Sequence, residues 1–193
     1  MRLGCRCSGA SQRATGRESM WPGPCNWNSR AWNWRTFAVP ACLLDVNVWV
    51  AAAFASHPAH HAARAVLLQA TPDAPALFCR ATQQSFLRLV STPAICAAYQ
   101  AASITNQDAL AALAAFQALP QVGLVDEPIG IEALWWRLAG LTVAAPKCWM
   151  DAYLAAFAIS SPTRMVTLDQ DFRQFIGAGL DLELLRADSN GGG

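Results

Sequence analysis

Short apolar runs alternate along the chain with segments whose composition favours helix. The apolar runs contain no regular polar positions, so neither of their faces is patterned for contact with water. Such strands are typical of mostly parallel sheets covered by helices on both sides, and the pattern predicts a five-stranded, three-layer α/β fold. The predicted strands span residues 41–45, 76–79, 121–125, 164–167 and 180–185, and the predicted helices span residues 46–54, 59–69, 82–90, 106–118, 129–138, 149–160 and 169–175.

Two helix starts and both ends of the chain need separate comment. Thr82 and Asn106 are the expected N-caps of their helices.

Residues 1–40 show no apolar periodicity and are rich in Gly, Ser, Arg and Pro, together with four of the eight tryptophans. We expect them to be a disordered extension, or sequence upstream of the true start codon, in preference to a basic arm that stacks on nucleic acid. Residues 41–186 form the predicted domain, and residues 187–193 a flexible tail.

Length and composition fit one folded domain. The chain has 193 residues, of which 54% are hydrophobic and 14% charged. These values exclude a wholly disordered chain and predict a core that needs no disulfide or zinc to hold it. No apolar stretch approaches the ~18 residues that a membrane span requires, so no membrane anchor is expected.

Charge and cysteine usage bear on the partners and the compartment. Residues 1–40 carry +5 from six arginines and one glutamate, whereas the remainder carries −4 from eight basic and twelve acidic residues. An acidic body does not attract nucleic acid over its whole surface, but an acidic site can hold a divalent cation that meets phosphate. The seven cysteines include no C-x₂-C pair and no export signal is present, so we expect a cytoplasmic protein with buried free thiols at Cys42, Cys79 and Cys96.

Four aspartates lie where a site of such a fold is expected. Asp45 ends the first strand, Asp169 and Asp171 follow the fourth, and Asp151 opens the helix before the fourth. Ligands of open α/β sheets bind beyond the carboxyl ends of the strands, so the four carboxylates converge if the first and fourth strands are neighbours. A hard cation such as Mg²⁺ or Mn²⁺ would relieve their repulsion. Taken singly, Asp151 and Asp169 could be helix N-caps or first-turn acids and Asp171 a solvated first-turn residue, but solvation does not explain Asp45 at the end of its strand.

Three segments that carry these aspartates read LLDVNVWV at residues 43–50, KCWMDAYLAAFA at residues 147–158 and VTLDQDF at residues 166–172. In this order they resemble the VapC-type toxins of the PIN-domain ribonuclease family. The resemblance covers about residues 41–186. It implies a five-stranded parallel sheet, one or two Mg²⁺ or Mn²⁺ ions, and endonucleolytic cleavage of RNA. It also implies a cognate VapB-type antitoxin that covers the acidic pocket, and a homodimer.

The resemblance assigns roles by position. Asp45, Asp151 and Asp169 match the catalytic, metal-binding acids of the family, and Asp171 matches a further metal-binding acid. In the family, a metal-activated water attacks phosphorus while the cation neutralises the charge that develops on the phosphate oxygens.

Small polar residues support the pocket in this family, and Asn47 and Thr167 match them. Many members carry a glutamate just after the threonine at the start of the third helix, but Gln83 follows Thr82 here. A glutamine can offer a carbonyl oxygen or orient a water, but it contributes no charge and cannot act as a base. We therefore expect Gln83 to support the pocket, with the second metal position in doubt.

Basic residues are few in the acidic body, so their positions are informative. Arg80 and Arg88 flank the start of the predicted helix at residue 82, and Lys147 precedes Asp151. All three are candidates for contact with the RNA backbone, with ordinary solvated side chains as the alternative.

Other side chains favour structural interpretations. His57, His60 and His61 precede a helix and fit ordinary surface histidines better than a ligand set. Trp135 and Trp136 fit core and interface positions better than a platform for a base.

Two rival functions remain to be separated from RNA cleavage. A phosphatase with Asp45 as nucleophile, as in haloacid-dehalogenase-like proteins, needs a second aspartate two residues on, where this chain has Asn47. A PIN-like module that binds RNA or protein without cutting is suggested by Gln83.

Overall fold

The computed structural model describes residues 40–187, and its centre is a five-stranded sheet with the strand order β3-β2-β1-β4-β5. All four pairs of neighbouring strands are parallel. The prediction of a five-stranded, mostly parallel sheet is therefore confirmed. The strands are β1 (Cys42–Leu44), β2 (Ala76–Cys79), β3 (Val122–Val125), β4 (Arg164–Thr167) and β5 (Leu182–Leu184).

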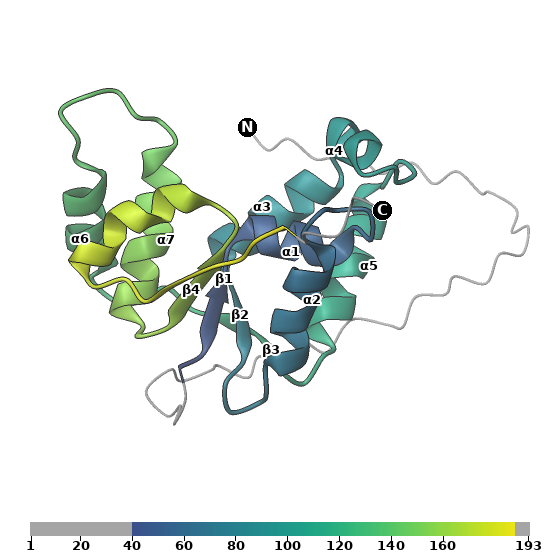
Figure 1. Cartoon of the computed structure of the whole chain (residues 1–193), viewed down its shortest axis with the longest axis horizontal. Coiled ribbons are helices and arrows are strands. Elements are labelled where there is room, and N and C mark those ends of the chain that lie inside the picture. Colours follow the sequence, from purple (N-terminus) through teal and green to yellow (C-terminus); the bar gives the residue numbers. More distant parts are fainter. Residues whose placement is uncertain (1–39, 188–193) are drawn as a thin grey trace, which may run out of the picture.

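Helices cover both faces of this sheet (Figure 1). The helices between β1 and β3 pack on one face, and those after β3 pack on the other. The first group is α1 (Val46–Ala53), α2 (His60–Gln69), α3 (Arg80–Val90), α4 (Pro93–Ala98) and α5 (Asn106–Gln117), and the second is α6 (Ile131–Ala139), α7 (Cys148–Ser160) and the 3₁₀ helix η2 (Gln170–Ala178).

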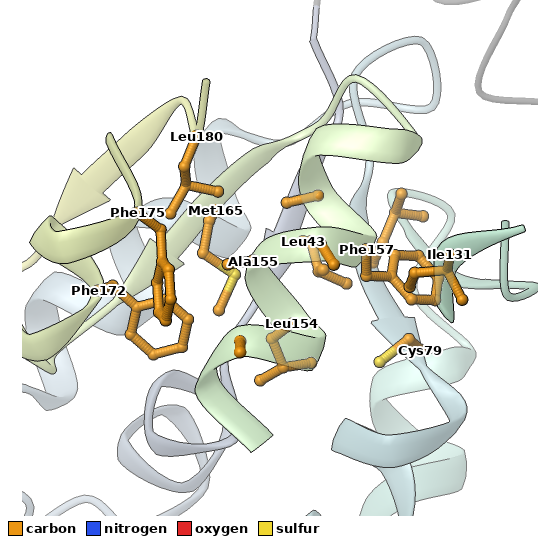
Figure 2. Packing of buried hydrophobic residues seen from close by; sticks show 14 of the residues in the cluster. Leu43, Cys79, Ile131, Leu154, Ala155, Phe157, Met165, Phe172, Phe175 and Leu180 are labelled. Atoms are coloured by element: carbon orange, nitrogen blue, oxygen red, sulfur yellow. The ribbon is translucent and has the colours of Figure 1, made fainter. Parts of the chain in front are cut away.

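Two apolar clusters, one on each face, hold the three layers together. Because successive strand residues point to opposite faces, Leu43 and Met165 join Phe157 of α7 in one cluster (Figure 2). Leu44 and Phe78 belong to the other cluster, beneath α1, α2, α3 and α5. The absence of polar positions in the strands thus corresponds to burial on both faces.

The order of the strands locates the candidate site. β1 pairs with β2 on one side and with β4 on the other, so the direction in which the chain adds strands reverses between β1 and β4. Leu44 lies opposite Val166 in this register, which brings the residues after them to the same edge. A crevice at such a reversal is where ligands bind in open α/β sheets.

Two capping predictions were wrong by a few residues. Cys79 precedes α3 as its N-cap, and Thr82 lies three positions later, where its hydroxyl oxygen accepts the N–H of Cys79 at 3.0 Å. Thr105, and not Asn106, caps α5 by accepting the N–H of Asp108 at 3.2 Å. In both cases a neighbouring residue satisfies the free backbone donors of the helix start.

Several other side chains differ from their sequence-based description. Trp135 is half-buried, but Trp136 is 61% exposed and does not belong to the core. The thiols of Cys79 and Cys96 are free and buried as expected, whereas Cys42 is only half-buried.

Two of the three histidines are less exposed than expected, whereas His61 is exposed as expected. His57 and His60 are half-buried, and each holds a backbone group through its Nδ1 atom. For His57, burial lowers the pKa below its usual value and thereby favours the neutral ring.

The predicted extension and tail fall almost entirely on residues 1–39 and 188–193, which lie outside the described part of the chain. Between residues 40 and 187, no helix combines the length and the apolar character needed to cross a membrane.

Candidate active site

Asp45 lies at the centre of the candidate site, directly after β1. Its backbone is extended, and its side chain caps α1 by accepting the N–H of Val46 through Oδ1 at 2.6 Å. The residue is only 6% exposed, and burial is the main cause that raises the pKa of its carboxyl group above 3.8. Hydrogen bonds from Thr167 and from Val46 act in the opposite direction, and Asp169 raises the pKa further.

A polar network joins Asp45 to the end of β4. The Thr167 hydroxyl donates to Asp45 Oδ2 at 2.7 Å, and the Asn47 amide donates to the same oxygen at 2.6 Å. Asn47 Oδ1 in turn accepts the N–H of Leu168 at 3.1 Å. Asn47 and Thr167 therefore lie where they can support the pocket, and together they orient the carboxylate of Asp45. The bonds that reach β4 and Leu168 connect residues about 120 positions apart in the chain.

Asp169 and Asp171 lie at the start of η2. Asp169 caps this helix, since its Oδ1 accepts the N–H of Asp171 at 2.9 Å. The N–H of Asp169 donates to the Thr167 hydroxyl oxygen at 3.0 Å, which fixes the backbone of Asp169 against the end of β4. The capping role considered from the sequence is therefore real for Asp169, but it leaves the second carboxylate oxygen without a hydrogen bond from the described residues.

Asp151 connects α7 to the other acids. It lies in the first turn of α7, and its pKa is raised from 3.8 to about 6. Burial is the largest cause, followed by the negative charges of Asp169, Asp45 and Asp171, while Lys147 lowers the pKa. The four predicted acids are thus near enough to repel one another, as expected if β1 and β4 are neighbours.

The four carboxylates are not arranged as a complete metal-binding site. Among residues 40–187, no three His, Cys, Asp or Glu side chains are arranged so that they could hold a metal ion as they stand. The oxygen-rich donor set does fit a hard divalent cation, because Mg²⁺ favours carboxylates and keeps several of its own waters. Asp45 also retains capacity to bind, since three donors occupy its roughly four lone-pair positions. The assignment of metal ligands stays a prediction.

Gln83 is 3% exposed, and its side-chain oxygen accepts a hydrogen bond from Arg80. A guanidinium group carries only donors, so it must face the oxygen of the amide and not its nitrogen. The Gln83 nitrogen is buried and has no partner among the described residues. No hydrogen bond joins Gln83 to the four acids within this part of the chain. This carbonyl oxygen thus accepts one hydrogen bond and keeps its second lone pair.

The three basic candidates lie at different distances from the acids. Lys147 is exposed and affects the pKa of Asp151 one turn away on α7. Arg80 opens α3 at the carboxyl end of β2, on the same edge of the sheet. Arg88 lies in the last turn of α3, about 12 Å further along the helix axis. The structure thus brings two of the three basic residues toward the site.

Two further arginines were missed from the sequence. Arg173 follows Asp171 by two residues, and Arg186 follows β5. Both line a hollow that also includes Leu168 and Gln170, the residues on either side of Asp169. The spacing of Arg173 from the acids could have identified it, whereas only the fold brings Arg186 to this place.

Comparisons with known proteins agree with this geometry. The PIN domain family model matches residues 42–177. Ribonuclease VapC41, from two strains of Mycobacterium tuberculosis, is 45% identical over 146 residues, which cover 74% of this chain and 97% of the relative.

Solved structures show the same fold at lower identity. VapBC2 of Rickettsia felis, solved with a promoter DNA fragment, matches with a TM-score of 0.53 and 16% identity over 76% of this chain and 99% of that chain. VapC20 of Mycobacterium tuberculosis, described as a toxin that cleaves the sarcin–ricin loop, matches with a TM-score of 0.51 and 15% identity over 72% of this chain and 96% of that chain. On the family match and the identity to VapC41, the chain belongs to the PIN-domain family and, within it, to the VapC-type ribonucleases.

Proposed function

We propose that this protein is the toxin of a type II toxin–antitoxin pair and that it hydrolyses phosphodiester bonds of RNA as an endoribonuclease. The observation that most strongly supports this proposal is the acidic site at the carboxyl ends of β1 and β4, in a chain 45% identical to a VapC ribonuclease. Asp45, Asp151 and Asp169 are the proposed catalytic acids.

A divalent cation, Mg²⁺ or Mn²⁺, is part of this proposal. Asp45, Asp151 and Asp169 would hold it, with Asp171 as a further ligand. Burial is the largest cause of the raised pKa of Asp151, and the neighbouring carboxylates raise it further; a cation between them would relieve that repulsion, which supports this assignment. A bound cation would activate a water and neutralise charge on the phosphate oxygens. Gln83 brings no negative charge to the site, which supports one cation in preference to two.

The protein's own residues have separable tasks in this scheme. Thr167 and Asn47 hold Asp45 in one orientation, so that the acid needs little rearrangement to bind a ligand. Lys147 and Arg80 are proposed to contact the RNA backbone, where positive charge positions the strand without reading its sequence. Arg88 would contact phosphate further from the cleaved bond.

The partners follow from the family. We propose a VapB-type antitoxin that covers the acidic pocket, supported by the toxin–antitoxin assembly named for the Rickettsia felis neighbour. A homodimer and a cytoplasmic location complete the proposal. Co-expression with any VapB-type gene found next to the gene of this protein, followed by size-exclusion chromatography with light scattering, tests both assemblies.

The decisive experiment is cleavage of end-labelled RNA by the purified protein in Mg²⁺, in Mn²⁺ and in EDTA. We expect cleavage with either ion, none in EDTA, and recovery when the ion is returned. Asp45→Asn and Asp151→Asn are expected to abolish cleavage, whereas Asp73→Asn, in an exposed turn before β2, removes the same charge and retains it.

Two results would argue against the proposal. Cleavage retained in both Asp45→Asn and Asp151→Asn would refute the assigned site. RNA binding without cleavage under every ion condition would instead identify a PIN-like binding module, the alternative that Gln83 suggests.

A further inference from the structure

A pocket of about 410 Å³ opens beside the acidic site, among the turn between α1 and α2, the start of η2 and the segment after β5. The residues that matter for its chemistry are His57, Leu168, Gln170, Arg173, Leu185 and Arg186.

The pocket is linked to the candidate active site through the chain segment around Asp169. Leu168 and Gln170 line it, and Asp169 lies between them in the chain. The backbone at Leu168 is held in place, because its N–H donates to Asn47 Oδ1 at 3.1 Å. A strand of RNA with its cleaved phosphate at Asp169 would therefore place a neighbouring nucleotide at this pocket.

The charge of the pocket is positive, in contrast to the acidic site next to it. Arg173 and Arg186 both line it, and no Asp or Glu does. Neither guanidinium makes a hydrogen bond or ion pair with any residue between 40 and 187. Arg164 differs, since it pairs with Asp181 at 3.1 Å. Two unpaired guanidinium groups beside a phosphodiester-cleaving centre are complementary to the phosphates that flank the cleaved bond.

The remaining lining suits a nucleobase. Leu168 and Leu185 supply apolar surface. His57 is fixed by two contacts, because its Nδ1 accepts the N–H of Ala59 at 3.0 Å and its ring lies 4.6 Å from that of Tyr99. Since Nδ1 is an acceptor, the neutral ring carries its proton on Nε2 and can donate it to a ligand. The pocket thus combines a flat ring, a donor and apolar walls.

We propose that this pocket binds one nucleotide of the RNA substrate next to the cleaved bond, with its phosphate on Arg173 and Arg186 and its base against His57 and Leu168. The inference rests on the proposed ribonuclease function and adds to it a site that positions the strand. A protein segment of the antitoxin is the competing occupant, and RNA is favoured because the pocket adjoins the acids and carries only positive charge.

The test separates binding from cleavage. Arg173→Gln/Arg186→Gln is compared with Arg64→Gln/Arg137→Gln, which removes two exposed arginines of α2 and α6 that do not line the pocket. Both pairs are built in the Asp151→Asn background, which cannot cut, and affinity for a short fluorescent single-stranded RNA is measured against salt. Loss of two phosphate contacts predicts an affinity lower by about 10-fold at 0.2 M salt and about 25-fold at 0.1 M salt. The slope of log affinity against log salt concentration should become smaller by about 1.4. The affinity and salt slope of the Arg64→Gln/Arg137→Gln control should differ less than this from those of the Asp151→Asn protein.

An abasic scan of the RNA tests the base contact. One abasic position next to the cleavage site should weaken binding of the parent but not of the Arg173→Gln/Arg186→Gln protein. Equal affinity and equal salt slope for the two double variants would overturn the inference. So would loss of antitoxin binding with RNA binding unchanged, which would assign the pocket to the protein partner. Failure of the proposed function is a different result, namely a wild-type protein that does not cleave RNA in Mg²⁺ or Mn²⁺.

Discussion

Replacing Asp151 by asparagine removes a carboxylate that is disfavoured both by burial and by repulsion from the other acids. The wild-type pKa of Asp151 rises from 3.8 to about 6, through burial and through Asp169, Asp45 and Asp171. This change corresponds to about 3 kcal/mol of disfavoured ionisation if it is felt in full. Asp151 is half-buried, so solvent screening reduces the effect, and we expect about 1 to 2 kcal/mol.

The direction in which stability changes with pH follows from proton binding to Asp151. Between pH 4 and pH 6 the folded protein keeps a proton on Asp151 that the unfolded chain has released. Stability therefore falls as the pH rises through this window, and the loss is complete above the folded-state pKa. Asp151→Asn has no such proton to lose. In EDTA at pH 8 we expect the variant to be more stable than the wild type by about 1 to 2 kcal/mol, and at pH 4 to be similar.

Urea unfolding followed by circular dichroism from pH 4 to pH 8 measures this difference. Asp73→Asn serves as the matched loss of one exposed carboxylate. Saturating Mn²⁺ should reverse the order, since ion at one hundred times its dissociation constant stabilises a binding protein by about 2.7 kcal/mol and leaves the variant nearly unchanged. An Asp151→Asn protein that is no more stable than wild type at pH 8 in EDTA would show that burial and repulsion do not disfavour the Asp151 carboxylate as described.

Three other substitutions test separate parts of the structure. Thr167→Val removes the hydroxyl that donates to Asp45 at 2.7 Å. We expect the free energy of unfolding, measured in urea, to fall by about 1 to 3 kcal/mol and RNA cleavage to become slower; cleavage at the wild-type rate would contradict the positioning role of Thr167. Trp49→Ala deletes a buried ring that stacks on Phe78 with 3.7 Å between the ring centroids. We expect the free energy of unfolding in urea to fall by about 3 to 5 kcal/mol, and a fall below about 1 kcal/mol would contradict this packing. Arg164→Gln breaks exposed ion pairs at the edge of β4, and its effect on the melting temperature should correspond to less than about 1 kcal/mol.

The layers of the fold and the neighbourhood of the acids could be predicted from the sequence. Strands without polar positions indicate burial on both faces, and the parallel arrangement then places Asp45 and Asp169 at one edge. The pairing of β1 with β4 confirms that expectation. The capping residues were less accessible to sequence reasoning, because Thr105 and Asn106 are both good N-caps and only the backbone geometry selects between them.

Contacts between distant loops could not be predicted from local patterns. The pocket beside Asp169 draws its lining from three segments, of which the turn at His57 and the segment at Arg186 carry no motif. The engagement of Gln83 by Arg80 depends on side-chain rotamers that composition does not determine. Helix α4 was also missed, since its six residues are too few for a recognisable apolar period.

The bonds from Thr167 to Asp45 have a consequence for synthesis of the protein in the cell. Their two partners are separated by 122 positions, so the ribosome must release almost the entire domain before the acidic centre can assemble. A nascent chain that ends before β4 contains Asp45, Asn47 and Asp151 but lacks Thr167 and Asp169. The complete acidic centre can therefore form only after nearly the whole domain has left the ribosome.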